Sequence, residues 1–213
     1  MSTAALSGPS VSALLPPTPE LSDARRRVFE AAIVLFGRSG YHAVSVRDIA
    51  AELGLKPMAL YAHVASKQEL LYELVKLGFA THRDRMSAAL LEVSADPLDQ
   101  IRALCEAHVR VHLDYPALAR VTNRETESLD EQYRPDLQRM REDAARSFEE
   151  VVARGQRLSV FVDDDPFLII QAIGGLGTRT PEWWTPELGV SAEAVVKTYA
   201  DFAIRILTGG PAA

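Results

Sequence analysis

The stretch from Ser45 to Lys67 holds two short amphipathic segments separated by a glycine, and it constrains the fold more than any other part of the chain. Apolar residues recur at helical spacing in the first segment, and Gly54 follows where a helix end needs a left-handed residue. Ser45 is placed to cap this helix, and Pro57 falls in the first turn of the next, where its missing N–H is tolerated. Two short helices joined by a glycine turn are typical of the DNA-binding helix-turn-helix.

The polar residues outside the apolar stripe of this stretch suit contact with DNA. Ser45 and Arg47 lie at a helix N-terminus, where backbone N–H groups attract phosphate. The net charge of this region gives no support for DNA binding, because residues 20–66 hold six Lys/Arg against five Asp/Glu. The alternative is a pair of helices whose polar face contacts only water. The first turn of the second helix is the part that usually reaches base edges. We predict DNA contacts for Ser45, Val46, Arg47, Lys56, Pro57, Met58, Ala59, Tyr61, His63 and Lys67.

Three motifs in and around this stretch, LFGRSGY, SVRDIA, and LYAHVASK followed by ELL, resemble the N-terminal domain of the tetracycline-repressor (TetR) family of transcriptional regulators. The resemblance runs from Asp23 to Leu71. It implies an all-helical homodimer that binds a palindromic operator and releases it when a small ligand enters the C-terminal domain. Lys56 and Val64 depart from the family pattern, which more often has Ser or Thr and an aromatic residue there. The resemblance also implies phosphate or groove contacts for Ser45, Arg47, Tyr61, His63 and Lys67.

Composition and charge divide the chain into a tail and two domains. Residues 1–20 are rich in Ser, Ala and Pro, so we expect a disordered tail. Residues 21–67 would form the helix-turn-helix domain, and residues 68–213 a ligand-binding and dimerisation domain. Residues 1–93 carry a net charge of +1 and residues 94–213 a net charge of −7, so the second domain would stay off the DNA phosphates. The single cysteine suits a reducing cytoplasm, and no apolar run reaches membrane-spanning length.

Helical periodicity continues to the C-terminus, so the predicted fold class is all-α, with about nine helices. Ser66 and Glu69 have the spacing of a capping box at the start of a long helix. Its apolar positions predict roughly 28 residues, or about 40 Å. Such a helix would connect the DNA-binding domain to the rest of the chain.

A second subunit would explain the glycine-rich helix that follows Asp163–Pro166. The acidic run resembles a metal cluster, but it is better explained as an N-cap followed by Pro at the first helical position. Glycines inside a helix are unfavourable unless a close contact compensates, and we expect that contact from a partner helix. The predicted dimer interface consists of Phe167, Ile170, Gly174, Gly177, Tyr199, Phe202 and Ile206.

His108 and His112 are four residues apart, the spacing at which two imidazoles on a helix can share a metal ion. No third ligand is evident nearby, so we predict no metal site. The alternatives are hydrogen bonds to a bound ligand, or core histidines bonded within the protein. No acid–base or nucleophile arrangement points to an enzyme or a cofactor. The predicted ligand-binding residues are Phe79, Met86, Leu104, His108, His112, Met140, Phe148 and Trp183.

Together these features predict a ligand-responsive repressor that binds a palindromic operator as a homodimer and is released by a small lipophilic effector. The segments RPDLQRMREDAARSFEEVV and GTRTPEWWTPELGVSAEAVVKTYADFAIRIL are similar to TetR members that control lipid or acyl-CoA catabolism, so an acyl-CoA or related lipid is a candidate effector. The alternatives are an architectural DNA binder without sequence preference and a helical enzyme that uses His108 and His112.

Overall fold

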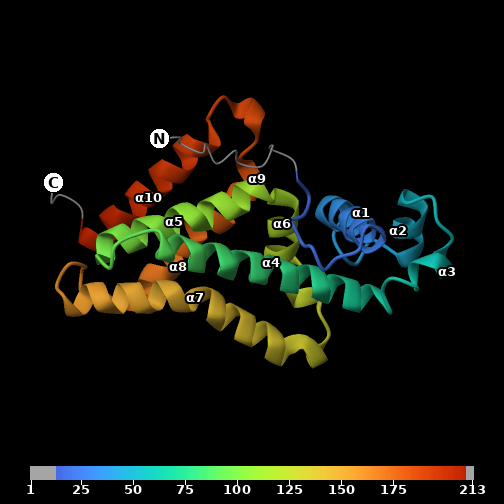
Figure 1. The fold of residues 1–213 in the computed structure, drawn as a ribbon, viewed down its shortest axis with the longest axis horizontal. Coiled ribbons are helices and arrows are strands. Elements are labelled where there is room, and N and C mark those ends of the chain that lie inside the picture. The colour runs from blue at the N-terminus through green and yellow to red at the C-terminus, as the bar shows by residue number, and fades with distance from the viewer. Residues whose placement is uncertain (1–12, 210–213) are drawn as a thin grey trace.

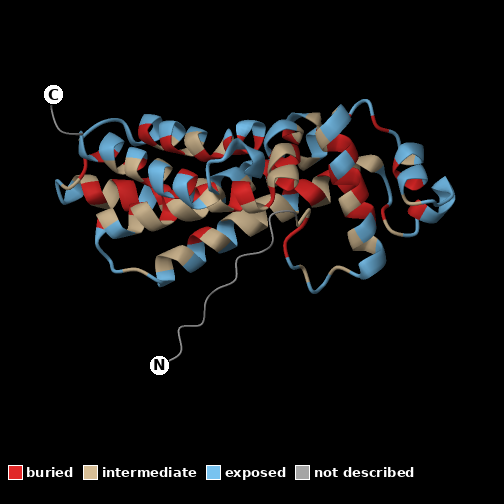
Figure 2. Ribbon diagram, turned by 90° about the horizontal axis from the view of Figure 1, so that it is seen from above, coloured by how far each residue is buried: buried red, intermediate tan, exposed pale blue. Residues whose placement is uncertain are grey.

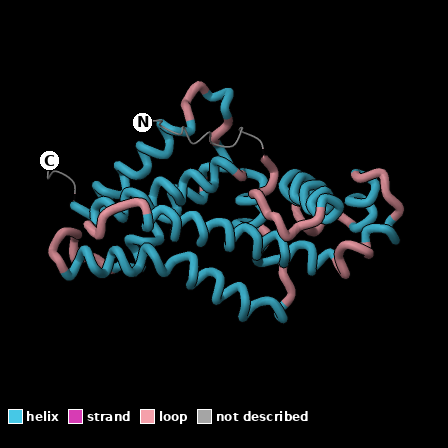
Figure 3. The backbone as a smooth tube through the Cα atoms, in the orientation of Figure 1, coloured by secondary structure: helices cyan, strands magenta, loops and turns pink. Residues whose placement is uncertain are grey.

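The computed structural model describes residues 13–209, and the regular secondary structure in this part of the chain is entirely helical (Figures 1 and 3). The all-α prediction is therefore confirmed, with ten α-helices among the described residues, of which α3 and α9 are four residues long. None of them is long and apolar enough to cross a membrane. The elements are α1 (Asp23–Ser39), α2 (Val46–Glu52), α3 (Pro57–Leu60), α4 (Lys67–Leu91), α5 (Pro97–Asp114), α6 (Pro116–Arg124), α7 (Arg134–Arg157), α8 (Pro166–Thr178), α9 (Thr180–Trp183) and α10 (Ala192–Thr208), with 3-10 turns at Thr126–Ser128, Glu131–Tyr133 and Pro186–Leu188.

The helix-turn-helix forms from local signals in the sequence. Ser45 makes a reciprocal capping box with Asp48: the Ser45 Oγ accepts the Asp48 N–H at 3.2 Å, and the Asp48 Oδ2 accepts the Ser45 N–H at 2.7 Å. After α2, Gly54 adopts a φ of +66°, the left-handed conformation that the turn requires. Lys56 begins α3 without a side-chain cap. The single turn of α3 is instead held by Leu60, which is completely buried.

The long helix α4 extends from the helix-turn-helix into the body of the protein (Figure 1). It has 25 residues and starts where the sequence predicts, because the Ser66 Oγ accepts the Glu69 N–H at 3.0 Å. It packs against α1 and also against α5, α6 and α7. The same helix therefore contributes to the DNA-binding end and to the C-terminal body.

One hydrophobic core continues across the predicted domain boundary at residue 67. It joins Phe36 of α1 and Leu60 of α3 to Leu74 of α4 and Val121 of α6. In Figure 2, ribbon segments coloured as buried occur on both sides of this boundary. A separate core around Met86 is formed mainly by α5, α7, α8 and α10. The helix-turn-helix is thus packed onto the C-terminal body and not joined to it by a flexible linker.

The predicted disordered tail is partly ordered. Its residues 1–12 lie outside the described residues, but residues 13–20 are described. Leu15 is buried in the same core as α1. The Arg26 guanidinium donates a hydrogen bond to the Pro16 carbonyl at 3.0 Å. The Ser, Ala and Pro content of this segment predicts disorder, but burial of Leu15 against α1 orders part of it.

Candidate DNA-binding surface and ligand cavity

The predicted DNA contacts form an accessible surface at one end of the molecule. In the first turn of α3, Met58 is 80% exposed, and Lys56, Pro57 and Ala59 are exposed beside it. Ser45, Arg47 and Tyr61 are also exposed, whereas Val46, His63 and Lys67 are half-buried. Tyr61 keeps 48% of its surface exposed. Seven of the ten side chains assigned to DNA are therefore exposed, and the other three are partly covered by the protein itself.

Lys67 has a structural role that the sequence did not reveal. Its Nζ donates to the carbonyl oxygens of Tyr41 at 3.0 Å and Val44 at 2.7 Å, and it lies 4.0 Å from the centre of the Tyr41 ring. Burial lowers the pKa of the Lys67 ammonium. Because two of its three N–H donors hold the connector between α1 and α2, one donor remains for a phosphate.

The C-terminal body contains a cavity of about 330 Å³ between α4, α5, α6, α7 and α8. Of the eight residues predicted to bind a ligand, Phe79, His108, His112 and Phe148 line this cavity. The other four do not. Met86 and Leu104 are packed in the neighbouring core, Met140 is half-buried on α7 outside the lining, and Trp183 is 41% exposed on α9.

Several lining residues were not predicted from the sequence. They include the polar residues His82 of α4 and Thr122 of α6, and Arg141 of α7. His82 lies in a polar stretch of α4 that gives no periodic signal. Its spacing from Phe79 offers a clue, because residues three apart share one face of a helix, and Phe79 is a predicted ligand-binding residue that lines the cavity.

Three histidines in the cavity wall form a hydrogen-bonded cluster. The His82 Nε2 lies 2.9 Å from the His108 Nδ1, and the His108 Nε2 lies 3.0 Å from the Gly174 carbonyl oxygen. The His112 Nδ1 lies 2.7 Å from the His108 carbonyl oxygen. The first two bonds connect α4 to α8 through a side chain of α5.

Burial keeps these histidines neutral. It lowers the pKa of each imidazole below its usual value, and it lowers the pKa of His112 to about 3. The neighbouring histidines also oppose protonation of His82 and His112. Neutral imidazoles have one N–H donor and one lone-pair acceptor each, so the cluster has a defined donor and acceptor pattern.

The cluster is not arranged as a metal site. Within residues 13–209, no group of three His, Cys, Asp or Glu side chains is placed to hold a metal ion.

The acidic run before α8 acts as the predicted cap, because the Asp165 Oδ1 accepts the Phe167 N–H at 2.8 Å.

The predicted dimer residues divide between a surface and the cavity. Phe167 is 65% exposed, Phe202 39% and Ile206 38%, and Tyr199 is half-buried beside them. Ile170 and Gly174 line the cavity instead.

The close contact expected of the glycines is made within the protomer. Gly177 is buried, and a Cβ atom at this position would overlap the His108 ring. Its assignment to the dimer interface was therefore wrong, because the approaching group is a histidine of α5 and not a partner helix. Gly174 and Gly175 have open space where a Cβ would lie.

We expect Gly177→Ala to destabilise the protein by about 1–3 kcal/mol, as overpacking of a dense core does. The His108 ring cannot move aside without losing its hydrogen bonds to His82 and Gly174. Thermal unfolding would measure this as a fall in Tm of roughly 2–4 °C per kcal/mol. Gly175→Ala is the matched control at an exposed position of the same helix, and it should be neutral or stabilising by up to about 1 kcal/mol. Equal Tm values for the two variants would contradict the packing argument.

Comparison with known proteins identifies the family. The family profile described as "Bacterial regulatory proteins, tetR family" matches residues 28–74. The profile described as "Tetracyclin repressor-like, C-terminal domain" matches residues 94–207, which is more than half of the 213 residues. The two matches cover the helix-turn-helix and most of the helices around the cavity.

Individual relatives share both the sequence and the fold over nearly the whole chain. The HTH-type transcriptional repressor KstR2 of Mycobacterium tuberculosis is 25% identical over 197 residues, which cover 90% of this chain and 94% of KstR2. A bacterial regulatory protein in the tetR family from Rhodococcus RHA1 is 29% identical, with a TM-score of 0.81, over 90% of this chain and 100% of that chain.

AibR, solved in complex with isovaleryl coenzyme A and operator DNA, is similar in fold only. Its TM-score is 0.76 at 18% identity, over 87% of this chain and 98% of that chain. Members of the family bind operator DNA and small-molecule effectors, usually as dimers, and they are regulators and not enzymes. The chain belongs to the TetR family of transcriptional regulators.

Proposed function

We propose that this regulator is a repressor that binds a palindromic operator as a homodimer and leaves it when a small lipophilic effector occupies the cavity. The observation that carries the proposal is that α4 belongs to both sites. Lys67, its first residue, holds the connector of the helix-turn-helix, and Phe79 and His82 line the cavity. From Lys67 to His82 is about 22 Å along a continuous helix at 1.5 Å per residue, so a shift at the cavity reaches the DNA-binding end.

A second helix supports the same coupling. Thr122 of α6 lies directly against Gly78 of α4, where an added Cβ would overlap the threonine side chain. On its other side, α6 packs against α1, and Val121 lies in the core shared with the helix-turn-helix. An effector that separates α4 from α6 would change the position of α1 and α2. It acts as a switch only if it binds the two conformers with different affinity.

The proposed homodimer would form through α8 and α10. These helices expose Phe167, Leu168, Phe202 and Ile206 on the surface of the protomer. Two antiparallel pairs of such helices would make an isologous four-helix interface. The dimer would place its two α3 helices about 34–36 Å apart, or at a larger spacing along one face of the DNA. It would act in the cytoplasm, where the buried free thiol of Cys105 stays reduced.

The effector proposed here is lipophilic because the cavity is lined by Phe79, Val111, Leu118, Phe148 and Ile170. Arg141 adds a cation to the lining. KstR2 is described as a ketosteroid transcriptional regulator, and AibR was crystallised with isovaleryl coenzyme A. Acyl-CoA thioesters and related lipids are therefore the first effector classes to test on this chain.

Operator binding tests the proposal. The purified protein would be titrated into labelled DNA from its own promoter and into a scrambled duplex of equal length, with fluorescence anisotropy as the readout. A dimeric repressor should prefer the promoter by about a thousandfold or more, and light scattering should give the mass of a dimer. Equal affinity for both duplexes would instead favour the architectural DNA binder.

Arg47 and Met58 should affect binding in different ways. Arg47→Ala removes a cation next to the N-terminus of α2, so it should weaken binding to all duplexes and lower the slope of log K against log salt by about 1. Met58→Ala changes an apolar contact in the first turn of α3. It should alter the preference between operator variants and leave the salt slope unchanged. A slope unchanged by Arg47→Ala would reject its phosphate contact.

A further inference from the structure

Four exposed residues mark the mouth of the cavity. The lining residues contributed by α4 and α5 are all buried or half-buried, whereas α6, α7 and α8 contribute four that are exposed: Asn123, Arg141, Gln171 and Gly175. Gly174 and Gly175 have open space where a Cβ atom would lie, so side chains of α8 do not obstruct the opening. A ligand that enters here keeps its outer end beside these four residues.

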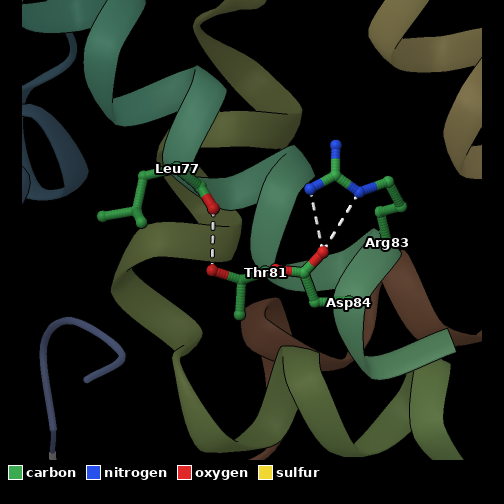
Figure 4. A network of polar contacts seen from close by, with 4 residues as sticks. All are labelled: Leu77, Thr81, Arg83 and Asp84. Carbon is green, nitrogen blue, oxygen red and sulfur yellow. Dashed lines mark hydrogen bonds and ion pairs between the residues drawn. The ribbon is translucent and has the colours of Figure 1, made fainter. Parts of the chain in front are cut away.

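The inner wall formed by α4 and α5 contributes no charge within the described part of the chain. Burial keeps the imidazoles of His82, His108 and His112 neutral. The Thr81 hydroxyl donates to the Leu77 carbonyl oxygen at 2.7 Å (Figure 4). An ion against this wall would lose its hydration without gaining a counter-ion. The inner part of the cavity therefore suits the apolar part of a ligand.

Arg141 is the one charged residue that lines the cavity among residues 13–209. Its guanidinium Nη2 donates to the Glu127 Oε1 at 2.7 Å, and this bond uses one of its five N–H donors. Arg83 of α4, by contrast, lies outside the lining and bonds to Asp84 (Figure 4). Arg141 is therefore the group that can bind an anion at the mouth.

The ion pair between Arg141 and Glu127 is easily exchanged. The Arg141 side chain is 48% exposed and that of Glu127 is 84% exposed. Exposed ion pairs contribute little to stability, because both ions are well hydrated when apart. A carboxylate or phosphate on a bound ligand can form two parallel hydrogen bonds to a guanidinium. Because two anions on one guanidinium repel each other, such a ligand would displace Glu127.

The segment that contains Glu127 also contacts the start of α4. The Gln68 side chain donates to the Ser128 carbonyl oxygen at 3.0 Å and accepts the Asp130 N–H at 3.1 Å. Gln68 follows Lys67, which holds the connector of the helix-turn-helix. Release of Glu127 from Arg141 would therefore separate α7 from a segment that is bonded to α4 next to Lys67.

We propose that the cavity binds an amphipathic anion with its apolar end inward, and that the carboxylate or phosphate binds Arg141 at the mouth in place of Glu127. The role of this ligand as effector rests on the proposed function, but its binding is measured without DNA. The proposal goes beyond a lipophilic effector, because it requires a negative charge at one end of the ligand and assigns the recognition of that charge to one residue.

Ligands with one alkyl chain and different head groups test the proposal: decanoate, decanol, decylammonium and decanoyl-CoA. Each would be titrated into the full-length protein by calorimetry at pH 7.5, below the concentration at which it forms micelles. We expect an anionic ligand to bind about tenfold or more tightly than decanol and decylammonium, since hydrogen bonds between ions are the stronger ones. A preference for decanoate assigns the site to a carboxylate, and a preference for decanoyl-CoA alone assigns it to the phosphates.

Arg141→Gln should remove the preference for the anion and leave the affinity for decanol unchanged. Arg139→Gln is the matched control, because Arg139 is an exposed arginine of the same helix that pairs with Asp136 and does not line the cavity. Both variants lose one positive charge. Residues 94–213 carry a net charge of −7, so the overall charge of this domain does not favour anions and a preference for them requires a local cation.

A double-mutant cycle tests the exchange with Glu127. Glu127→Gln should raise the affinity for the anion several-fold, because the competing carboxylate is gone, and it should have no effect once Arg141→Gln is present. If Glu127 acted only by long-range repulsion, its replacement would raise the affinity equally in both backgrounds. Thermal unfolding of each variant would verify that it is folded.

Three results would overturn the proposal: equal binding of decanol and both anions, a full anion preference in Arg141→Gln, or no binding of any ligand in the accessible range. A Glu127→Gln effect that persists without Arg141 would overturn the exchange. Loss of operator preference together with intact, Arg141-dependent binding of the anion would reject the proposed function alone, because these titrations contain no DNA.

Discussion

Lowering the pH from 7.5 to 5 is expected to destabilise this protein strongly, before most of its carboxylates protonate. Burial lowers the pKa values of His82, His108 and His112, that of His112 to about 3, whereas in the unfolded chain they titrate near about 6.5. Between these values only the unfolded state binds the protons, so the stability is complete above pH 6.5 and is lost as the pH falls. His112, whose pKa in the folded protein is about 3, accounts for about 2 kcal/mol of the loss at pH 5, and the lowered pKa values of His82 and His108 act in the same direction.

Urea unfolding at the two pH values measures this loss. His112→Gln removes one titrating group and keeps an amide donor, so it should lose about 2 kcal/mol less than the natural chain between pH 7.5 and pH 5. His42→Gln replaces an exposed histidine and should lose as much as the natural chain. Carboxylates such as Asp201, whose pKa Arg102 and Lys197 lower to about 2, stay charged throughout. An identical loss in His112→Gln would show that the buried imidazole is not the cause.

The helix-turn-helix could be predicted because its signals are local. Ser45 and Asp48 are three residues apart and cap α2 within one turn. Gly54 needs only its own φ to end that helix. The start of α4 and the cap at Asp165 also depend on neighbouring residues, whereas α4 ends after 25 residues and not after the roughly 28 predicted. Interactions of this range can be read from spacing without knowledge of the tertiary fold.

The cavity could be predicted only in part. Apolar periodicity shows which face of a helix is buried, but it does not show whether that face lines a cavity or packs against another helix. Phe79 and Phe148 face the cavity, whereas Met86 and Leu104 have the same periodic signal and face a packed core. The glycines of α8 show the same limit. Three glycines within one helix indicate that another group packs closely against it. The group that contacts Gly177 is the His108 ring of α5, which is distant in sequence.

Lys67 lies at a helix start that local sequence signals predict, but its contacts to the Tyr41 and Val44 carbonyl oxygens are tertiary and could not be predicted. Its replacement should have the largest effect on DNA binding. Lys67→Met keeps the length of the side chain but removes the donors to the Tyr41 and Val44 carbonyl oxygens. Hydrogen bonds from a charged group contribute about 1.5–3 kcal/mol each. The connector that places α2 would then lose its fixed position. We expect the operator affinity to fall by about a hundredfold, which corresponds to about 2.7 kcal/mol.

Lys76→Met is the matched control, because Lys76 is an exposed lysine on the same helix that pairs with Glu73 at 3.9 Å and does not hold the connector. Both variants lose one positive charge. If Lys67 acted only through a phosphate, Lys67→Met would reduce the salt slope by about 1 and leave the free protein as stable as before. If it anchors the connector, Tm falls in the absence of DNA, and the affinity decreases at every salt concentration. A Lys67→Met variant with an unchanged Tm would therefore assign this lysine to the DNA and remove the link between α4 and α2 on which the proposed release depends.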